Sequence, residues 1–316
     1  MSGRDLDAAG ITDAGLRAAY EECRRLNARH GKTYYLATLL LPREKRPYVH
    51  ALYGFARYAD EIVDAPETGQ DPAARLDELT KAFHEAVGSP RVNEHPVLRA
   101  VVDTIRRWDI DVSHVEDFLA SMAMDLTVGE YQTYDDLMGY VHGSASVIGE
   151  QMVPILEPLD AARAAPYARD LGTAFQLANF IRDVGEDLDR GRVYLPLEDL
   201  ARFGLNRADL EQRVVDERVR DLLRFEIARV RRLALAADPG IALLHPTSRP
   251  CIEAARVLYC GIVDEVERID FQVFDRRASV PLRRRLAVAG RAYVRGRAAR
   301  RSTPPEHPPR QRLQDE

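Results

Sequence analysis

The sequence predicts an all-α protein, and three observations carry the prediction. Apolar residues recur at helical spacing from about residue 12 to about residue 295. The helix formers Ala, Leu, Arg and Glu are abundant, and no run of alternating β-branched residues is long enough to propose a sheet. Prolines fall at spacings that suit helix ends, so we expect one domain of roughly ten helices.

Composition divides the 316 residues into three parts. We expect an N-terminal extension over 1–19, an all-helical domain over 20–295, and a disordered tail rich in Arg and Pro over 296–316. The chain shows no signal-peptide pattern, no run of 18 apolar residues and no paired cysteine spacing, which together predict a cytoplasmic protein. Its net charge of −5 argues against a general nucleic-acid binder.

A pair of aspartates stands near the end of the first strongly periodic segment, residues 47–64. Asp60 and Asp64 are four residues apart, so a helix places both carboxylates on one face. Extending this face towards the N-terminus adds Arg57 and then Tyr53. The segment therefore predicts a polar stripe along one helix.

The same theme occurs a second time, at Asp183 and Asp187. Here the stripe continues backwards through Asn179 and Gln176, on a helix expected to begin near Leu171. Amides on a helix face provide donors and acceptors that contact with water alone would not require. The two copies together are much more specific than one Asp-x-x-x-Asp, which usually marks a solvated face.

Two like charges at i and i+4 destabilise a helix by roughly 0.2–0.5 kcal/mol, and near a C-terminus they also oppose the helix dipole. A bound cation would remove both penalties. Mg2+ prefers hard oxygen ligands, takes one or two carboxylates, and is completed by phosphate and water. Two facing pairs would therefore make a diphosphate-binding mouth on an apolar helical cavity.

At these residues the sequence resembles the squalene and phytoene synthase family, and it is most similar to the bacterial phytoene synthases. The resemblance covers roughly residues 20–290. Its landmarks are the two aspartate stripes together with the segments 30–35, 41–42, 51–53, 124–126, 140–149, 176–187 and 191–196. The resemblance implies an isoprenoid synthase-type helical bundle around a central cavity.

The resemblance also implies roles for individual residues. The four aspartates would bind Mg2+ or Mn2+, and Tyr140 would lie near the reacting carbons. The residues that would contact substrate diphosphate or lie near the substrate head are Thr33, Tyr34, Tyr53, Arg57, Gln176, Asn179 and Arg182.

One stretch departs from the family pattern. Family members usually carry Val-Ala-Gly-Thr-Val-Gly just after the tyrosine that matches Tyr140, whereas this chain has serine at positions 144 and 146. The change affects the expected helix packing and the shape of the cavity, and it leaves the metal motifs intact.

The implied reaction is the head-to-head condensation of two geranylgeranyl diphosphates to phytoene, through a cyclopropyl diphosphate. Three alternatives stay open: the same chemistry on farnesyl diphosphate, a non-catalytic binding or assembly protein, and a di-metal oxidase. The second should have lost motif aspartates, and the third needs Glu-x-x-His pairs that this chain lacks. No Gly-x-Gly-x-x-Gly follows a strand, so we expect no nicotinamide cofactor. The oligomeric state is not predicted.

Residues 276–301 contain ten arginines and no acidic residue. A solvated helix face is the ordinary interpretation of such a run. The alternative is a peripheral contact with anionic lipid at the inner face of the membrane, because substrate and product would both be greasy. For Trp108 we expect a place in the core or at its rim, and for His142 a structural role.

Overall fold

The structure is a computed structural model that describes residues 2–64, 69–89 and 94–303. Over these residues the chain is helical, and its first half forms α1 (Ser2–Ala8), α2 (Ala14–His30), α3 (Lys32–Thr38), α4 (Arg46–Asp64), α5 (Pro72–Gly88), α6 (Pro96–Trp108), α7 (Ser113–Met124) and α8 (Tyr134–Val141). The second half forms the π-helical turn η1 (His142–Ser146), α9 (Val147–Leu156), α10 (Ala161–Asp189), α11 (Leu197–Arg202), α12 (Arg207–Glu211), α13 (Glu217–Leu243), α14 (Arg249–Arg268) and α15 (Leu282–Ser302).

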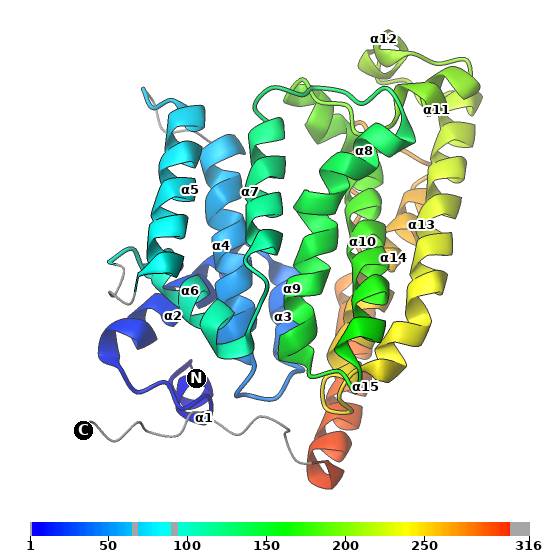
Figure 1. Cartoon of the computed structure of the whole chain (residues 1–316). Helices are drawn as coiled ribbons and strands as arrows, with labels where there is room; N and C mark the ends of the chain where they lie inside the picture. Colours follow the sequence, from blue (N-terminus) through cyan, green and yellow to red (C-terminus); the bar gives the residue numbers. More distant parts are fainter. Residues whose placement is uncertain (1, 65–68, 90–93, 304–316) are drawn as a thin grey trace.

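The longer helices stand side by side, with α4, α5 and α7 on one side of the bundle and α10, α13 and α14 on the other (Figure 1). One large apolar core joins α2, α4, α5, α6 and α7, and a second joins α8, α10, α13 and α14. In α4 the core residues Leu52, Phe55, Ala59 and Ile62 follow helical spacing. The opposite stripe of α4 is therefore left for the polar residues of the site.

Helix α10 forms the centre of the molecule, and two glycines let it pack closely. A Cβ on Gly172 would lie 2.5 Å from the carbonyl oxygen of Ala145 in η1. A Cβ on Gly149 of α9 would lie 2.3 Å from the carbonyl oxygen of Ala168. Both distances are shorter than a carbon–oxygen contact allows, so only glycine permits this approach.

The all-α prediction is confirmed: among the described residues there are fifteen α-helices and no strand beyond one isolated bridge. The prediction of about ten helices was too low, because short helices such as α11 and α12 carry little periodicity. The helix of the second aspartate pair begins at Ala161 rather than near Leu171. Its start is set by Asp160, whose side chain caps the helix by accepting from the backbone N–H of Arg163 at 3.1 Å.

Both ends of the chain contribute to the helical body. Within residues 1–19, which were expected as an extension, Leu6, Ala9 and Ile11 are buried in the first core. Helix α15 continues to Ser302, so the first residues of the expected tail are helical, while 304–316 lie outside the described residues. No helix in the described part of the chain has the length and hydropathy of a membrane span.

Candidate active site

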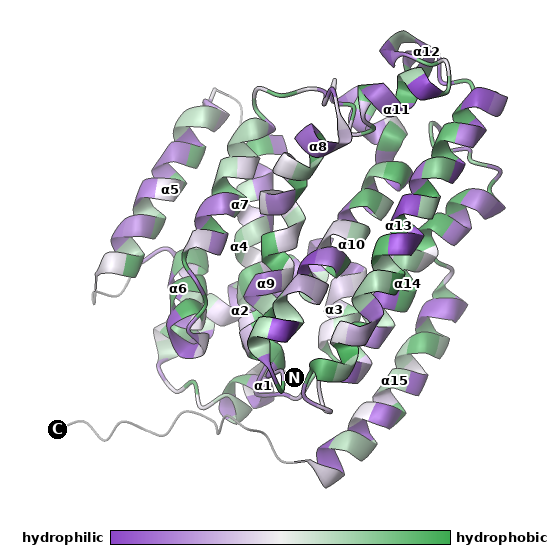
Figure 2. Cartoon of the chain, turned by 45° about the vertical axis from the view of Figure 1, so that its right-hand side comes forward, coloured by the Kyte–Doolittle hydropathy of each residue, from purple (hydrophilic) through white to green (hydrophobic). Residues whose placement is uncertain are grey.

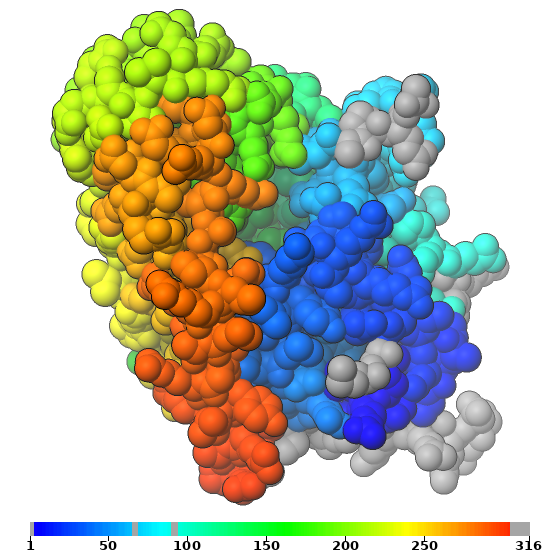
Figure 3. All heavy atoms as spheres, turned by 180° about the vertical axis from the view of Figure 1, so that it is seen from behind, coloured from blue at the N-terminus to red at the C-terminus, as the bar shows by residue number. Residues whose placement is uncertain are grey.

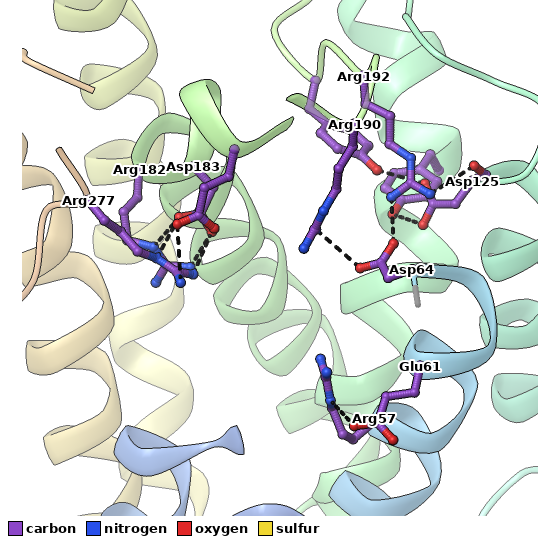
Figure 4. A network of polar contacts seen from close by, with 12 residues as sticks. Arg57, Glu61, Asp64, Asp125, Arg182, Asp183, Arg190, Arg192 and Arg277 are labelled. Carbon is purple, nitrogen blue, oxygen red and sulfur yellow. Dashed lines mark hydrogen bonds and ion pairs between the residues drawn. The ribbon is translucent and has the colours of Figure 1, made fainter. Parts of the chain in front are cut away.

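A cavity of about 470 Å³ is lined by residues of both cores. Its walls come mainly from α3, α4, α7, η1, α9, α10, α13 and α14. Charged side chains gather where the C-terminal ends of α4 and α10 approach each other, because Asp64 at the end of α4 contacts two arginines that follow α10 (Figure 4). Away from this polar end the lining is largely apolar, with Phe118, Ile148, Met152, Leu156, Leu171, Ile241, Leu244 and Ile252.

The first aspartate pair lies on the last turns of α4. Asp64 accepts hydrogen bonds from Arg192 at 2.8 Å and from Arg190 at 3.2 Å. Asp60, one turn earlier, makes no ion pair with any described residue. Burial and then the neighbouring Asp64 carboxylate raise the pKa of Asp60 from 3.8 to about 7. One carboxylate of this pair is thus held in ion pairs, whereas the other makes no ion pair with any described residue and only feels the charge of nearby Arg57.

The second pair lies near the end of α10. Arg182 donates from its Nε to Asp183 at 2.7 Å, and Arg277, from the link before α15, approaches the same carboxylate at 3.0 Å. Asp187 makes no ion pair within the described ranges. Burial and then the charge of Asp183 raise the pKa of Asp187 from 3.8 to about 8. This pair repeats the pattern of the first: one member is paired with arginine and the other is not.

These donors fit a divalent cation by their chemistry. Asp60 and Asp187 are partly buried carboxylates in a cavity wall, with raised pKa values and no arginine partner among the described residues. Mg2+ binds hard carboxylate oxygens such as those of these two residues, and phosphate and water complete its coordination shell. Over the described residues, no group of three or more His, Cys, Asp or Glu side chains converges. A metal here would therefore be held by one or two carboxylates.

A third acidic residue, Asp125, lies just after α7 and anchors two tyrosines. The hydroxyls of Tyr140 and Tyr194 each donate to its carboxylate at 2.8 Å. Arg192 bonds its backbone carbonyl at 3.1 Å and so joins this cluster to Asp64. Burial raises the pKa of Asp125 even though the two hydroxyl bonds act against the shift. The two phenols are held in place at the polar end of the cavity.

Aromatic rings form two groups at the cavity. Tyr194 stacks on Phe180 with ring centroids 4.2 Å apart and lies 5.4 Å from Tyr140. In the second group the lining residue Tyr34 has its ring centroid 4.4 Å from that of Tyr259 and 5.8 Å from that of Tyr53. Ring faces attract cations, so an electron-deficient carbon in this cavity would be favoured by its walls.

The structure brings together nearly all the residues that the sequence singled out. The cavity lining includes Tyr34, Tyr53, Arg57, Asp60, Asp64, Tyr140, Gln176, Asn179, Arg182, Asp183 and Asp187. Thr33 is the exception: it stands on the first turn of α3 and is not among the lining residues, whereas Thr38 at the other end of that helix is. Trp108 is buried in the first core, as expected. His142 is exposed, with its Nε2 3.4 Å from Asp117.

Sequence reasoning gave no role to four residues that complete the site: Asp125, Arg190, Arg192 and Arg277. Asp125 and Arg192 stood in landmark segments of the resemblance, but their partners lie on other helices. Arg277 belonged to the arginine run, where nothing in the sequence separates it from its neighbours. Only the fold shows that it reaches Asp183.

The departure at positions 144 and 146 falls on the π-helical turn η1. Ser146 is buried and its hydroxyl lies 2.9 Å from that of Thr173 on α10. Ser144 lines the cavity one turn beyond Tyr140, and its hydroxyl has no hydrogen-bond partner among the described residues. The substitutions therefore add one helix-to-helix hydrogen bond and one polar atom in the cavity wall.

The fold and the site define an all-helical isoprenoid synthase-type protein, with acidic helix ends at the polar end of an apolar cavity. The family model described as squalene/phytoene synthase matches residues 27–284, and the chain belongs to this family. The family prediction made from the sequence is thereby confirmed.

Curated relatives align over most of the chain. A phytoene synthase of Arthrospira platensis is 37% identical over 298 residues, covering 90% of this chain and 96% of its own. A 15-cis-phytoene synthase of Synechococcus elongatus is 36% identical over 293 residues, covering 89% and 94%.

Solved structures share the fold. A dehydrosqualene synthase in complex with ligand superposes with a TM-score of 0.82 at 24% identity, covering 90% of this chain and 98% of that one. A squalene synthase of Alicyclobacillus acidocaldarius superposes with a TM-score of 0.76 at 27% identity, covering 84% and 98%. The helical architecture expected from the sequence agrees with both.

Proposed function

We propose that this protein condenses two geranylgeranyl diphosphates head to head to give phytoene in carotenoid biosynthesis. The observation that carries the proposal is the meeting of two aspartate pairs at one end of an apolar, aromatic-walled cavity. Similarity to phytoene synthases of Arthrospira platensis and Synechococcus elongatus supports this choice of substrate and product.

The polar end would bind the diphosphate groups. Asp60, Asp64, Asp183 and Asp187 would hold Mg2+, with Mn2+ as the alternative ion. Bound metal would supply positive charge where the leaving diphosphate accumulates negative charge. Arg57 of α4 and Arg182 of α10 provide further positive charge in the cavity lining, and Gln176 and Asn179 provide neutral donors. The Oδ1 of Asn179 has no partner among the described residues, so it is available to a ligand.

The apolar part would protect the cation left by diphosphate departure. Its walls exclude water, and the faces of Tyr140, Tyr194 and Phe180 stabilise positive charge. Asp125 fixes the Tyr140 hydroxyl, so that ring keeps one orientation during the reaction. In the first step a bond forms between the two chains, and one diphosphate and one proton leave as the cyclopropane closes. In the second step the cyclopropyl diphosphate loses its diphosphate, rearranges and loses a proton. Released diphosphate or water held by a tyrosine would accept these protons.

The second candidate is the same condensation on farnesyl diphosphate, giving dehydrosqualene by proton loss, hydroxysqualene by addition of water, or squalene if an external hydride donor quenches the cation. The likeness in fold to a squalene synthase supports it. A non-catalytic role is disfavoured because all four motif aspartates are present and line the cavity. We propose prenyl diphosphates as the partners, no nicotinamide cofactor, no nucleic acid, and a cytoplasmic location with peripheral contact at the inner face of the membrane.

Purified protein with Mg2+ and no reductant, offered each prenyl diphosphate separately, tests the proposal. We expect a C40 hydrocarbon from geranylgeranyl diphosphate, identified by mass, and no product once a chelator removes the metal. If only a C30 product forms, farnesyl diphosphate is the substrate and the second candidate is correct. Folded protein that makes neither product would contradict both enzymatic candidates.

A further inference from the structure

The cavity ends between α9, α10 and α13, where α10 packs on both of the other helices (Figure 2). This end lies away from the aspartate pairs. The lining residues of α10 span 164–187, and Tyr167 stands about 24 Å before Asp183 along the helix axis. We call this region the far end of the cavity, and its lining residues are Leu156, Ala164, Tyr167, Ala237, Gly240 and Leu244.

The two ends of the cavity differ in their exposure. At the polar end Arg277 contacts Asp183 and is 53% exposed. Figure 3 shows a hollow between the orange segment before α15, which carries this arginine, and the blue N-terminal helices. At the far end Leu156, Ala164 and Ala237 are buried. A prenyl chain whose diphosphate is bound at the polar end would therefore extend its tail towards the far end.

One aromatic ring stands among the residues of the far end, that of Tyr167. Tyr167 is half-buried: on one side of it Ala168 lines the cavity, and on the other side Pro166 is exposed. Its hydroxyl makes no hydrogen bond with any described residue, so packing alone determines where the ring lies. The bulk of this side chain, not its polarity, is therefore what it contributes to the far end.

Gly240 of α13 provides the place against which Tyr167 packs. A Cβ on Gly240 would lie 2.2 Å from the Cβ of Tyr167 and 2.7 Å from its Cγ, which is too close for any other residue. Glycine within a helix is less stable than alanine, and Gly240 does not have the positive φ that would require glycine. Its role is therefore to let α10 bring Tyr167 against α13 at the far end.

We propose that Tyr167 determines the longest prenyl chain that the cavity accepts. Its ring, packed on Gly240, lies where the tail of a C20 chain ends, and the additional five-carbon unit of a C25 chain would collide with it. The choice of prenyl chains as ligands rests on the proposed function. Tyr167 acts on the tail of the chain and takes no part in the loss of diphosphate.

Saturated alkyl diphosphates test this role without turnover, because a saturated chain forms no allylic cation. Calorimetric titration with C15, C20 and C25 compounds in the presence of Mg2+ gives each Kd. The parent should bind C20 more tightly than C15, since more apolar surface is buried, and C25 more weakly than C20. Y167A should bind C25 about tenfold more tightly than the parent does and leave the Kd of C15 unchanged.

A series of sizes at the same position provides the matched variants. Y167L removes less volume than Y167A and should show a smaller gain for C25. Y167W adds volume and should weaken C20 binding about tenfold without changing C15. Y167F keeps the ring and should bind all three compounds like the parent.

Y58A is the control outside the site, because Tyr58 is a half-buried tyrosine that does not line the cavity. It should leave the ratios of the three Kd values unchanged. Thermal unfolding of every variant verifies that the fold is retained. A parent that binds C25 as tightly as C20, or a Y167A variant in which all three Kd values change by the same factor or none changes, would overturn the proposal.

Turnover of allylic diphosphates separates this inference from the proposed function. Y167A should raise kcat/KM for the C25 substrate relative to the C20 substrate about tenfold, and an unchanged ratio would overturn the role of Tyr167. If the saturated compounds bind in the expected order but no allylic diphosphate yields a hydrocarbon, the proposed function fails, whereas the limit that Tyr167 sets on chain length is upheld.

Discussion

Helices α4 and α10 carry the same pair of aspartates but arrange the counter-charges differently. On α4 the later aspartate, Asp64, is paired with arginine, whereas on α10 it is the earlier one, Asp183. The remaining members, Asp60 and Asp187, have raised pKa values of about 7 and about 8. The position of the arginines decides which carboxylate is left for a cation, and the sequence motif alone does not.

The arginines that bind the two aspartate pairs also come from different parts of the chain. Arg190 and Arg192 follow α10 directly but bind Asp64 of α4. Asp183 is held instead by its neighbour Arg182 and by Arg277 from the far end of the chain. Arginines on or directly after α10 therefore bind an aspartate of each pair, whereas no arginine of α4 binds either Asp64 or Asp183.

The largest expected effect comes from the aspartates without arginine partners. D60N and D187N should each lower kcat/KM by roughly a thousandfold, because preorganised charge at a leaving group contributes on this scale. Steady-state rates with Mg2+ in excess provide the measurement. D103N, which changes an aspartate outside the cavity lining, is the control. If either D60N or D187N kept activity within tenfold of the parent, the two aspartates would not have equivalent roles.

The next largest effect should come from weakening the hydrogen bonds that Tyr140 and Tyr194 donate to Asp125. Asp125→Asn weakens both hydroxyl bonds, and we expect kcat to fall roughly a hundredfold with a smaller change in KM. Tyr194→Phe removes one of the two bonds and should lower kcat about tenfold. Kinetics on both variants would test this order. A larger loss in Tyr194→Phe than in Asp125→Asn would show that Asp125 does not act through the tyrosines.

The two arginines that bind Asp64 differ in burial, so replacing each of them should lower activity by a different factor. Arg192 is 13% exposed and also bonds Asp125, whereas Arg190 is 50% exposed. Arg192→Gln should therefore reduce kcat/KM about tenfold, and Arg190→Gln about twofold. Parallel assays of the two variants provide a matched comparison, and equal losses would contradict the distinction.

The smallest effect concerns stability and pH. The pKa values of Asp60 and Asp187 are raised in the folded state, so these two carboxyl groups bind more protons in the folded protein than in the unfolded chain above pH 4. The contribution of these two carboxyl groups to the stability of the metal-free protein should therefore be lost as pH rises from about 4 to about 8. Added Mg2+ should raise Tm more at pH 8 than at pH 6, because fewer protons then compete for the carboxylates.

Thermal unfolding of the D60N/D187N variant is the control for this pH effect. It should unfold at a higher temperature than the metal-free parent at pH 8, since two partly buried carboxylates that make no ion pair with any described residue are gone. It should also respond little to Mg2+. A difference in metal-free Tm between the parent and D60N/D187N that stays constant from pH 4 to pH 8 would refute the assignment of raised pKa values.

The sequence was sufficient for features that depend on local spacing. Four-residue intervals placed Asp60 with Asp64 and Asp183 with Asp187. Apolar residues at helical spacing on the other side of α10 are buried, namely Leu171, Ala174, Ala178 and Ile181. Family resemblance then supplied the relation between the two helices.

Features that depend on long-range packing could not be predicted in this way. The contact of Arg277 with Asp183 spans 94 residues, and that of Arg192 with Asp64 spans 128. Thr33 and Thr38 are both polar residues on one short helix, and the orientation of α3 decides that Thr38 lines the cavity. The π-helical turn at Ser144 and Ser146 packs tightly on α10, a long-range contact that the local sequence does not indicate.

The most direct test of the central claim is to locate bound metal. Crystals soaked with Mn2+ and inorganic diphosphate would reveal the ion by its anomalous scattering. The arrangement of the two helices predicts peaks at the polar end of the cavity, within bonding distance of Asp60 or Asp64 and of Asp183 or Asp187, with diphosphate between them. Peaks confined to one helix, or none at this end of the cavity, would contradict a joint metal site.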